Sequence, residues 1–255
     1  MENKMKTIVI TVKCLPDPEI LKQVKTGGTG NDVETVSYKL DTFDLVALEE
    51  ALLIKEASGG EVVILSMGPS EAKKEIRSGL AMGADRGILV EYDGRIESAV
   101  FARLLKKVVE KENPDLVLMG KQSMNDEFGQ TGQMLACLMG WSQVCFASEI
   151  EMANNHAIVK RESDGYLETL DVPLPAVITV GLTNHSPRYI SLPGTRRAKS
   201  KPIDTFSAKD LKVGIAPWVK RIAVENPSRT SGKCELFRNV DDFLDALRTT
   251  APDIF

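Results

Sequence analysis

The chain has 255 residues, of which 43% are hydrophobic and 27% charged, and its formal net charge is −4 at pH 7. A chain of this length buries a large core in one or two domains, and its negative charge argues against nucleic acid as the main partner, because phosphate backbones are bound by basic faces. No apolar run approaches the roughly 18 residues of a membrane helix, so we predict no membrane insertion.

The first half of the chain alternates between predicted strands and helices. A β-branched run at 7–12 predicts a buried parallel strand, and the polar, glycine-bearing stretch at 25–31 predicts a loop or hairpin tip. Apolar residues at helical spacing then predict a helix that Thr42 or Asp44 caps and that the glycines at 59–60 end. The same reasoning predicts strands at 61–66, 86–90 and 115–119 and helices at 70–82, 99–111 (capped by Ser98) and 133–139.

This alternation defines the fold class. We predict an α/β fold with a doubly wound, mostly parallel, Rossmann-like sheet. Beyond residue 145 the pattern changes to short strands, which predict a small β-rich, partly antiparallel extension; they lie at 149–152, 157–161, 168–172 and 176–180. From residue 181 the chain is loop-rich and basic, with one late helix at 240–248. We therefore predict a nucleotide-binding domain at 1–180 and an extended C-terminal arm at 181–255 that wraps a partner.

The segment between the strand at 115–119 and the helix at 133–139 is the most informative. It is polar and contains Gly120, Gly129 and Gly132. A strand that ends at glycine and leads through a loop into a helix is where open α/β sheets bind nucleotides, because the first amides of the helix are free to bind a phosphate. The segment is neither a G-x-G-x-x-G motif nor a Walker loop, so an ordinary polar strand–helix turn is the alternative from these residues alone.

Side chains that commonly carry catalysis or bind metals are few and scattered. His156 and His185 lie in polar contexts without other ligands nearby and are predicted to be surface histidines. Glu49 and Glu50 are adjacent on a predicted helix, where they point in different directions, so we expect a solvated face rather than a catalytic pair. Arg77 and Arg86 are left unassigned, and the scattered cysteines predict a reduced compartment without disulfides or zinc; the cysteines are Cys14, Cys137, Cys145 and Cys234.

Five segments carry a resemblance that no single motif does. They are Val12-Lys13, Ala47–Ala51, Leu80–Gly87 (LAMGADRG), Gly120–Gln122 with Gln130–Met134, and Val159–Gly165 with 168–170 and 175–179. In their order and spacing they resemble the small (β) subunit of electron transfer flavoprotein over nearly the whole chain. The ordered set is specific, although none of its motifs is specific alone.

The resemblance implies an electron carrier rather than an enzyme. Such a β subunit pairs with a larger α subunit that holds FAD, and the dimer accepts electrons from soluble flavin dehydrogenases such as the acyl-CoA dehydrogenases of fatty acid oxidation. The β subunit itself binds AMP as a structural group. In an alternative branch of the family, β binds a second FAD and the dimer bifurcates electrons from NADH. A free-standing adenine-nucleotide sensor or nucleotidyl-transfer enzyme is a third hypothesis, which the missing catalytic constellation argues against.

The nucleotide is expected at the carboxyl ends of the parallel strands. Backbone amides from Gln130 to Gly132 are predicted to hold its phosphate, and Met67 to pack against its base. Lys13 is predicted to lie near the site, with an ordinary surface lysine as the alternative. The complete set of predicted cofactor-binding residues is Thr11, Lys13, Ser66, Met67, Gly68, Gly120, Gln122, Asp126, Gly129, Gln130, Thr131 and Gly132.

The resemblance also implies contacts to partners. Phe43 takes the family's aromatic position near the flavin of the α subunit, with a core or helix-staple phenylalanine as the alternative, and Pro18 stands where the family often has tyrosine. Residues 189–199 resemble the loop that recognises dehydrogenases, or else form a solvated basic loop. In it, Leu192 and Pro193 are expected to fill an apolar pocket, while a basic set steers an acidic partner surface; the set is Arg196, Arg197 and Lys199.

The compartment follows from the N-terminus and the family together. Residues 1–6 are short and polar and lead directly into a strand, so we expect no secretory signal peptide. The first six residues also lack the arginine-rich, amphipathic pattern of a transit peptide. We therefore predict the bacterial cytoplasm, with the mitochondrial matrix as the alternative.

Overall fold

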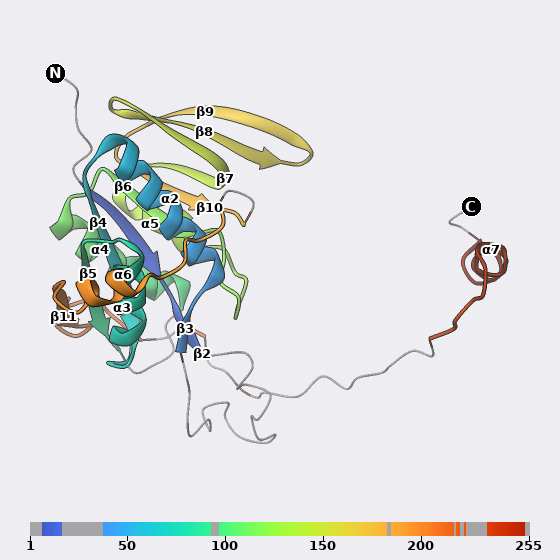
Figure 1. Cartoon of the computed structure of the whole chain (residues 1–255), viewed down its shortest axis with the longest axis horizontal. Helices are drawn as coiled ribbons and strands as arrows, with labels where there is room; N and C mark the ends of the chain where they lie inside the picture. The colour runs from blue at the N-terminus through green and yellow to red at the C-terminus, as the bar shows by residue number, and fades with distance from the viewer. Residues whose placement is uncertain are drawn as a thin grey trace. The chain divides into compact units, whose positions relative to one another are not determined.

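A computed structural model describes residues 7–16, 38–92, 97–182, 185–216, 218–219, 222 and 234–252. It shows a mixed α/β structure built on one large sheet (Figure 1). Its strands are β1 (Thr7–Val12), β2 (Cys14–Pro16), β3 (Tyr38–Leu40), β4 (Glu61–Gly68), β5 (Arg86–Glu91), β6 (Leu116–Gly120), β7 (Ser142–Ala153), β8 (His156–Ser163), β9 (Tyr166–Pro173), β10 (Ala176–Val180) and β11 (Ile203–Ser207). Its helices are α2 (Thr42–Ser58), α3 (Ala72–Met82), α4 (Ser98–Glu112), α5 (Thr131–Met139), α6 (Leu192–Ala198) and α7 (Val240–Thr250). The loop expected at 25–31, Pro18 and residues 1–6 lie outside the described residues.

The large sheet has nine strands in the order β11-β5-β4-β1-β6-β10-β7-β8-β9. Every pairing from β11 to β7 is parallel, whereas β8 pairs antiparallel with both β7 and β9. The mostly parallel sheet is thus confirmed. From β1 the chain proceeds outward through β4 and β5 and then returns to β6 on the other side of β1. The carboxyl ends of β1 and β6 therefore flank a topological switch point, the place where open α/β sheets bind ligands.

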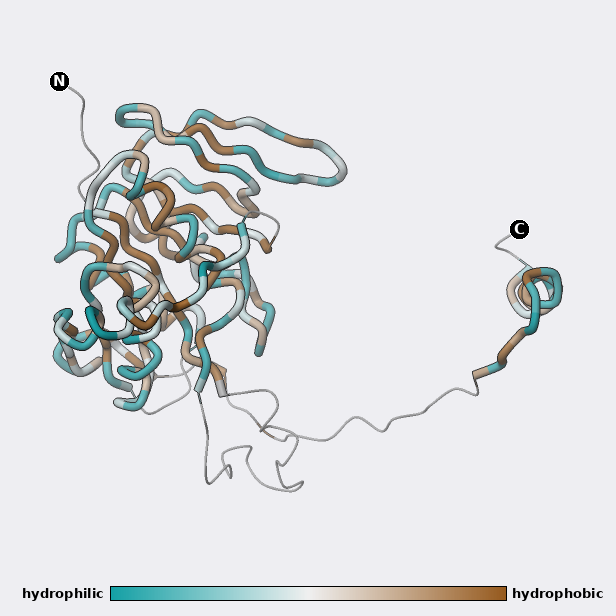
Figure 2. The backbone as a smooth tube through the Cα atoms, in the orientation of Figure 1, coloured by the Kyte–Doolittle hydropathy of each residue, from teal (hydrophilic) through white to brown (hydrophobic). Residues whose placement is uncertain are grey.

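Helices cover both faces of the parallel part of the sheet. Because side chains alternate along a strand, Ile8 and Ile10 of β1 pack into one core with apolar residues of α2 and α3. Val9, between them, packs into a second core with residues of α4 and α5. Figure 2 shows the apolar residues concentrated on these central strands. Two well-packed layers hold the strand ends, and so the switch point, in fixed positions.

The starts of α3, α4 and α5 each differ from the sequence predictions. α3 begins at Ala72, not at residue 70, because the turn after Pro69 occupies the intervening residues. α4 begins at Ser98 itself, so this serine is the first helical residue and Glu97 is the N-cap. α5 begins at Thr131, two residues earlier than expected. The last difference matters most, since it brings the start of α5 into the glycine-containing loop.

The β-rich extension continues the main sheet. β7 begins at Ser142, seven residues before the predicted strand, and pairs first in parallel with β10 and then antiparallel with β8. Register shifts interrupt both ladders near Ala147. Such an irregularity breaks the alternating pattern from which a strand is recognised, which explains why the first half of β7 was missed.

The segment after β10 contains two elements that the sequence did not indicate. α6 lies against α3, and β11 is a parallel edge strand beside β5 (Figure 1). The described residues 185–216 belong to the same compact unit as the sheet, while α7 belongs to a second unit. α7 confirms the predicted late helix. The predicted boundary at residue 180, between a nucleotide-binding domain and a partner-binding arm, differs from this division into compact units and stays a prediction.

Candidate functional site

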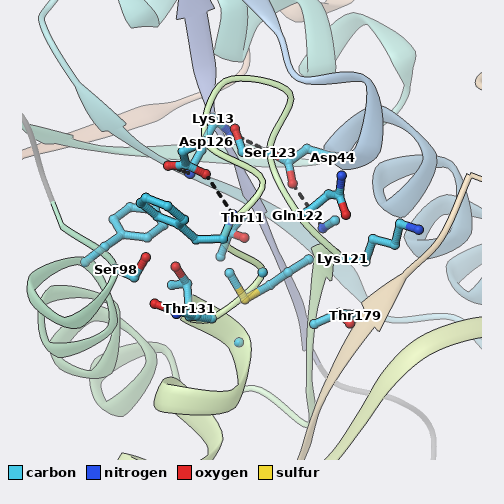
Figure 3. Close-up of a pocket in the computed structure, with 17 residues that line it drawn as sticks. Thr11, Lys13, Asp44, Ser98, Lys121, Gln122, Ser123, Asp126, Thr131 and Thr179 are labelled. Atoms are coloured by element: carbon cyan, nitrogen blue, oxygen red, sulfur yellow. Dashed lines mark hydrogen bonds and ion pairs between the residues drawn. The ribbon is translucent and has the colours of Figure 1, made fainter. Parts of the chain in front are cut away.

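A cavity opens at the switch point, at the carboxyl ends of β1 and β6 (Figure 3). It comprises about 440 Å³ of space, part of which is open to solvent. Nine of the twelve predicted cofactor-binding residues line it: Thr11, Lys13, Gly120, Gln122, Asp126, Gly129, Gln130, Thr131 and Gly132. The lining also includes residues that the sequence analysis did not name for the site: Asp44, Ser98, Phe101, Met119, Lys121, Ser123, Phe128 and Thr179.

The other three predicted residues lie on β4 and are not part of the lining. Ser66 is fully buried, and its hydroxyl donates to the carbonyl oxygen of Val12 at 2.9 Å. Met67 packs into the core beside α4, and Gly68 ends the strand next to Glu91 of β5. β4 is on the side of β1 away from β6, whereas the cavity lies between β1 and β6. Strand order, which the sequence does not state, separates these residues from the cavity.

Asp44 connects the two strand ends at the base of the cavity. One of its carboxylate oxygens accepts a hydrogen bond from the amide of Lys13 at 2.7 Å, and the other accepts from the amide of Gly120 at 3.0 Å. These amides follow β1 and end β6. Gly120 is required by close approach, because a Cβ there would lie 2.6 Å from the Cβ of Phe43. The start of α2 thus fixes the separation of β1 and β6.

Asp41 caps α2 and also holds the loop that follows β6. Its Oδ1 accepts from the amide of Phe43 at 2.9 Å, which is the N-cap hydrogen bond. The prediction that Thr42 or Asp44 caps this helix was wrong, because Thr42 is already helical and the carboxylate of Asp44 serves the strand ends. The other oxygen of Asp41 accepts from the hydroxyl of Ser123 at 2.9 Å and from the amide of Met124 at 2.8 Å.

Burial, together with the neighbouring carboxylate of Asp41, raises the pKa of Asp44 to about 7. The backbone amides of Lys13 and Gly120 act the other way, since they donate to the ionised form. One wall of the cavity therefore carries a group that changes its charge near neutral pH.

The opposite side of the cavity is the start of α5. Gln130 is its N-cap residue and supplies no side-chain capping bond, so the first amides of the helix keep their capacity to bind an anion. Gly129 has a φ of +56°, which favours glycine, and a Cβ on Gly132 would lie 2.8 Å from the Cγ2 of Thr179. Figure 3 shows the hydroxyl-bearing side chains of Ser98 and Thr131 close to one another on this side.

Lys13 and Asp126 meet at the edge of the cavity. The ammonium of Lys13 lies 3.4 Å from a carboxylate oxygen of Asp126, and both side chains are partly buried (Figure 3). A partly exposed pair of this kind contributes about 1 kcal/mol or less to stability. Its greater consequence is geometric, because it keeps a cation beside the space that the amides of α5 face.

Lys121 lies between two aromatic rings at the end of β6. Its ammonium is 5.6 Å from the ring centre of Phe43 and 5.7 Å from that of Phe146, within cation–π range. Phe43 is buried, whereas Phe146 is 48% exposed. Phe146 also has a φ of +62°, rare for a phenylalanine, and its amide donates to the Thr179 hydroxyl at 3.2 Å. No sequence pattern pointed to Phe146, because its position follows from the irregular register of β7.

The expectation that Glu49 and Glu50 form a solvated face was wrong, because the segment after β10 covers them. Only 5% of Glu49 and 3% of Glu50 is exposed. The guanidinium of Arg188 makes a two-pronged pair with Glu49 at 2.8 and 2.9 Å, and Nδ1 of His185 lies 3.0 Å from Glu50. His185 and His156 themselves are about half exposed, as expected of surface histidines.

The predicted recognition residues lie on α6 or directly after it. Leu192 is the first residue of this short helix and is 73% exposed, and Pro193 follows it. Ser191 caps the helix by accepting from the amide of Gly194 at 3.1 Å. The basic residues Arg196, Arg197 and Lys199 are all exposed. The expected loop is therefore a capped helical turn that presents one apolar and three basic side chains.

Two classes of site are missing from the part of the chain that the structure describes. None of its His, Cys, Asp and Glu side chains form a group of three or more that could hold a metal ion. None of its helices has the length and apolar character needed to cross a membrane.

Comparisons with known proteins agree with this architecture. A family model described as "Electron transfer flavoprotein domain" matches residues 32–211. The mitochondrial electron transfer flavoprotein subunit beta of Arabidopsis thaliana is 44% identical over 96% of this chain and 98% of its own length. The electron transfer flavoprotein subunits beta of Bradyrhizobium diazoefficiens and Homo sapiens are 42% and 41% identical, over 87% and 88% of this chain and 89% and 91% of theirs. The chain therefore belongs to the family of electron transfer flavoprotein β subunits.

Proposed function

We propose that this chain pairs with an electron transfer flavoprotein α subunit, binds AMP as a structural group, supports the FAD of the α subunit and docks flavin dehydrogenases of the acyl-CoA dehydrogenase type. Its role is electron transfer rather than catalysis of a reaction of its own. The observation that carries the nucleotide assignment is the cavity at the switch point, where an uncapped helix start, a lysine and two hydroxyls converge.

The residues around the cavity suit an adenosine monophosphate. Amides at the start of α5 bind and orient an anionic phosphate, and the ammonium of Lys13 adds a positive charge at the edge. Ser98 and Thr131 supply hydroxyls that donate to phosphate or ribose oxygens. The apolar surface for the base is provided by Phe101 and Phe128, which line the same space.

Support for the flavin of the α subunit is assigned to the cluster of Phe43, Lys121 and Phe146. FAD, when bound by the α subunit, supplies the redox chemistry. The side chain of Phe146 is exposed and that of Lys121 is partly buried, while Phe43 lies beneath them. The cluster thus offers an exposed aromatic ring beside a cation, which suits contact with a planar ring system. The compartment stays a prediction: the bacterial cytoplasm, or the mitochondrial matrix.

The affinity of the site for AMP is expected to rise as pH falls from about 8 to about 6, because Asp44 takes up a proton near pH 7. Above this pH the ionised carboxylate repels the phosphate, and below it the repulsion is lost. Isothermal titration of nucleotide-free αβ complex across this range measures the effect. Asp44→Asn is the comparison variant, since its side chain does not titrate.

AMP itself takes up a proton at the lower end of this pH range and so changes its affinity for both complexes. The effect of Asp44 is therefore measured as the difference in pH dependence of AMP affinity between the native and Asp44→Asn complexes. We expect a several-fold steeper rise for the native complex than for Asp44→Asn. Equal pH dependence in both would show that Asp44 does not act on the phosphate. Asp44→Asn is also expected to lower the free energy of unfolding by about 1–3 kcal/mol, since its amide group opposes one of the two backbone donors.

A further inference from the structure

The carboxyl-terminal ends of α3 and α6 are joined by two long cations that cross between them. Arg77 of α3 donates through Nη1 to the carbonyl oxygen of Ala198, at 2.6 Å, and to that of Lys201. Lys201, just after α6, donates through Nζ to the carbonyl oxygen of Leu80, at 3.1 Å, and to that of Ala84. Each cation thus binds carbonyl groups at the end of the other helix, where the helix dipole favours positive charge. We call these four hydrogen bonds the α3–α6 latch.

The backbones of the two helices also touch. Gly194 is buried, and a Cβ built on it would lie 2.4 Å from the carbonyl oxygen of Ala81. Ala198 faces the same side and is 3% exposed. Beyond Lys201, the carbonyl oxygen of Pro202 accepts a hydrogen bond from the amide of Gly87 at 3.0 Å, and the chain then continues into β11. One side of α6 is therefore fixed to residues 80–87, the LAMGADRG segment noted in the sequence.

The other side of the α6 region is exposed. Leu192 and the three basic residues face away from the core, and Tyr189 and Ile190, just before the helix, are 99% and 45% exposed. On the amino-terminal side the segment is held to α2 by Arg188, which pairs with Glu49 and, at 2.6 Å, with Glu56. Because both ends of this exposed apolar segment are held in place, the segment is ordered before a partner binds. Association then avoids the entropic cost of ordering it.

We propose that Arg77 and Lys201 are positioning residues that hold α6 in the orientation required for docking. The partner surface that fits is an apolar pocket for Leu192 with acidic groups around it, which the basic residues of α6 would face. This inference rests on the proposed docking function of α6. It assigns residues 80–87 to partner recognition through α6 rather than to the nucleotide cavity, whose lining does not include them.

The test uses Arg77→Met in the complete αβ complex, which keeps most of the side-chain volume and removes the donors. With a flavin dehydrogenase and its substrate, KM for the complex as electron acceptor is expected to rise about tenfold, while kcat and the flavin and nucleotide contents stay unchanged. Hydrogen exchange of the amides in 194–201 is expected to accelerate. Arg77→Lys should restore much of the native KM, because an ammonium can donate to the same carbonyls.

Two further variants keep the test decisive. Lys74→Met removes an exposed cation from the same helix and should leave both KM and exchange unchanged. Lys201→Met removes the reciprocal hydrogen bonds and should have the same effect on KM and on exchange as Arg77→Met. It provides the test if the Arg77→Met complex folds poorly. Faster exchange of α6 with an unchanged KM would make the latch purely structural and would overturn the proposal, as would unchanged exchange and KM in both variants.

The outcome for Leu192→Ala in the same assay separates this inference from the function on which it rests. If Leu192→Ala raises KM and the latch variants do not, only the positioning role fails. If Leu192→Ala leaves KM unchanged, the docking function of α6 fails, and the positioning role fails with it.

Discussion

Leu192→Ala is expected to reduce kcat/KM for electron transfer from a flavin dehydrogenase by about 30-fold or more, the loss typical of a central interface residue. Leu192 is 73% exposed at the start of α6, so its side chain contributes little to the stability of this chain. It lies outside the cavity lining, so flavin and nucleotide contents should not change. Stopped-flow measurement of flavin reduction, with the dehydrogenase concentration varied, gives the rate and affinity terms separately.

Leu192→Met is the matched control, because methionine is also apolar and has a similar side-chain volume, so it should retain most of the rate. A loss of flavin from the Leu192→Ala complex would mean that α6 supports the assembly rather than the encounter with a dehydrogenase. In that case the assignment of Leu192 as a docking residue would be abandoned.

Thr131→Leu is expected to expel AMP from the purified complex and to weaken the association of the two subunits. Thr131 is the first residue of α5 and lines the cavity directly beside the amides that we assign to the phosphate. A leucine there adds bulk and removes the hydroxyl. Mass spectrometry of the denatured complex measures the bound nucleotide, and analytical ultracentrifugation measures the association of the subunits.

Thr131→Ser separates the two effects of the substitution, since serine keeps the hydroxyl and adds no bulk. We expect the Thr131→Ser complex to retain its nucleotide. Full nucleotide content in Thr131→Leu would show that the phosphate is not held at the start of α5, whatever its effect on assembly.

Local patterns were sufficient to predict the central parallel strands β1, β4, β5, β6 and β10 and the loop that enters α5. β-branched runs and glycine stops act over a few residues, and the strand order then brings nine of the predicted residues to one cavity. The sequence did not reveal that the two aspartates at the start of α2 organise this cavity. Asp44 accepts hydrogen bonds from two backbone amides that lie 31 and 76 residues away in the chain. Over such separations, local sequence patterns carry no information about which residues are in contact.

The same limit explains the errors on α2 and α6. Adjacent glutamates on a helix normally face solvent, but Glu49 is covered by Arg188, which lies 139 residues further along. α6 has seven residues and its last carbonyl, that of Ala198, accepts a hydrogen bond from Arg77 of α3, so its stability depends on tertiary contacts rather than on its own helical propensity. Phe146 was missed because an irregular register, and not an alternating pattern, places its ring beside Lys121.

The nucleotide assignment is tested first by the nucleotide content of the purified αβ complex, determined by denaturing it and separating FAD from AMP by chromatography. We expect one FAD and one AMP per heterodimer, with the AMP lost in Thr131→Leu and retained in Leu192→Ala. Two FAD molecules and no AMP per heterodimer would contradict the assignment, because the cavity at the end of β1 and β6 would then hold a second flavin.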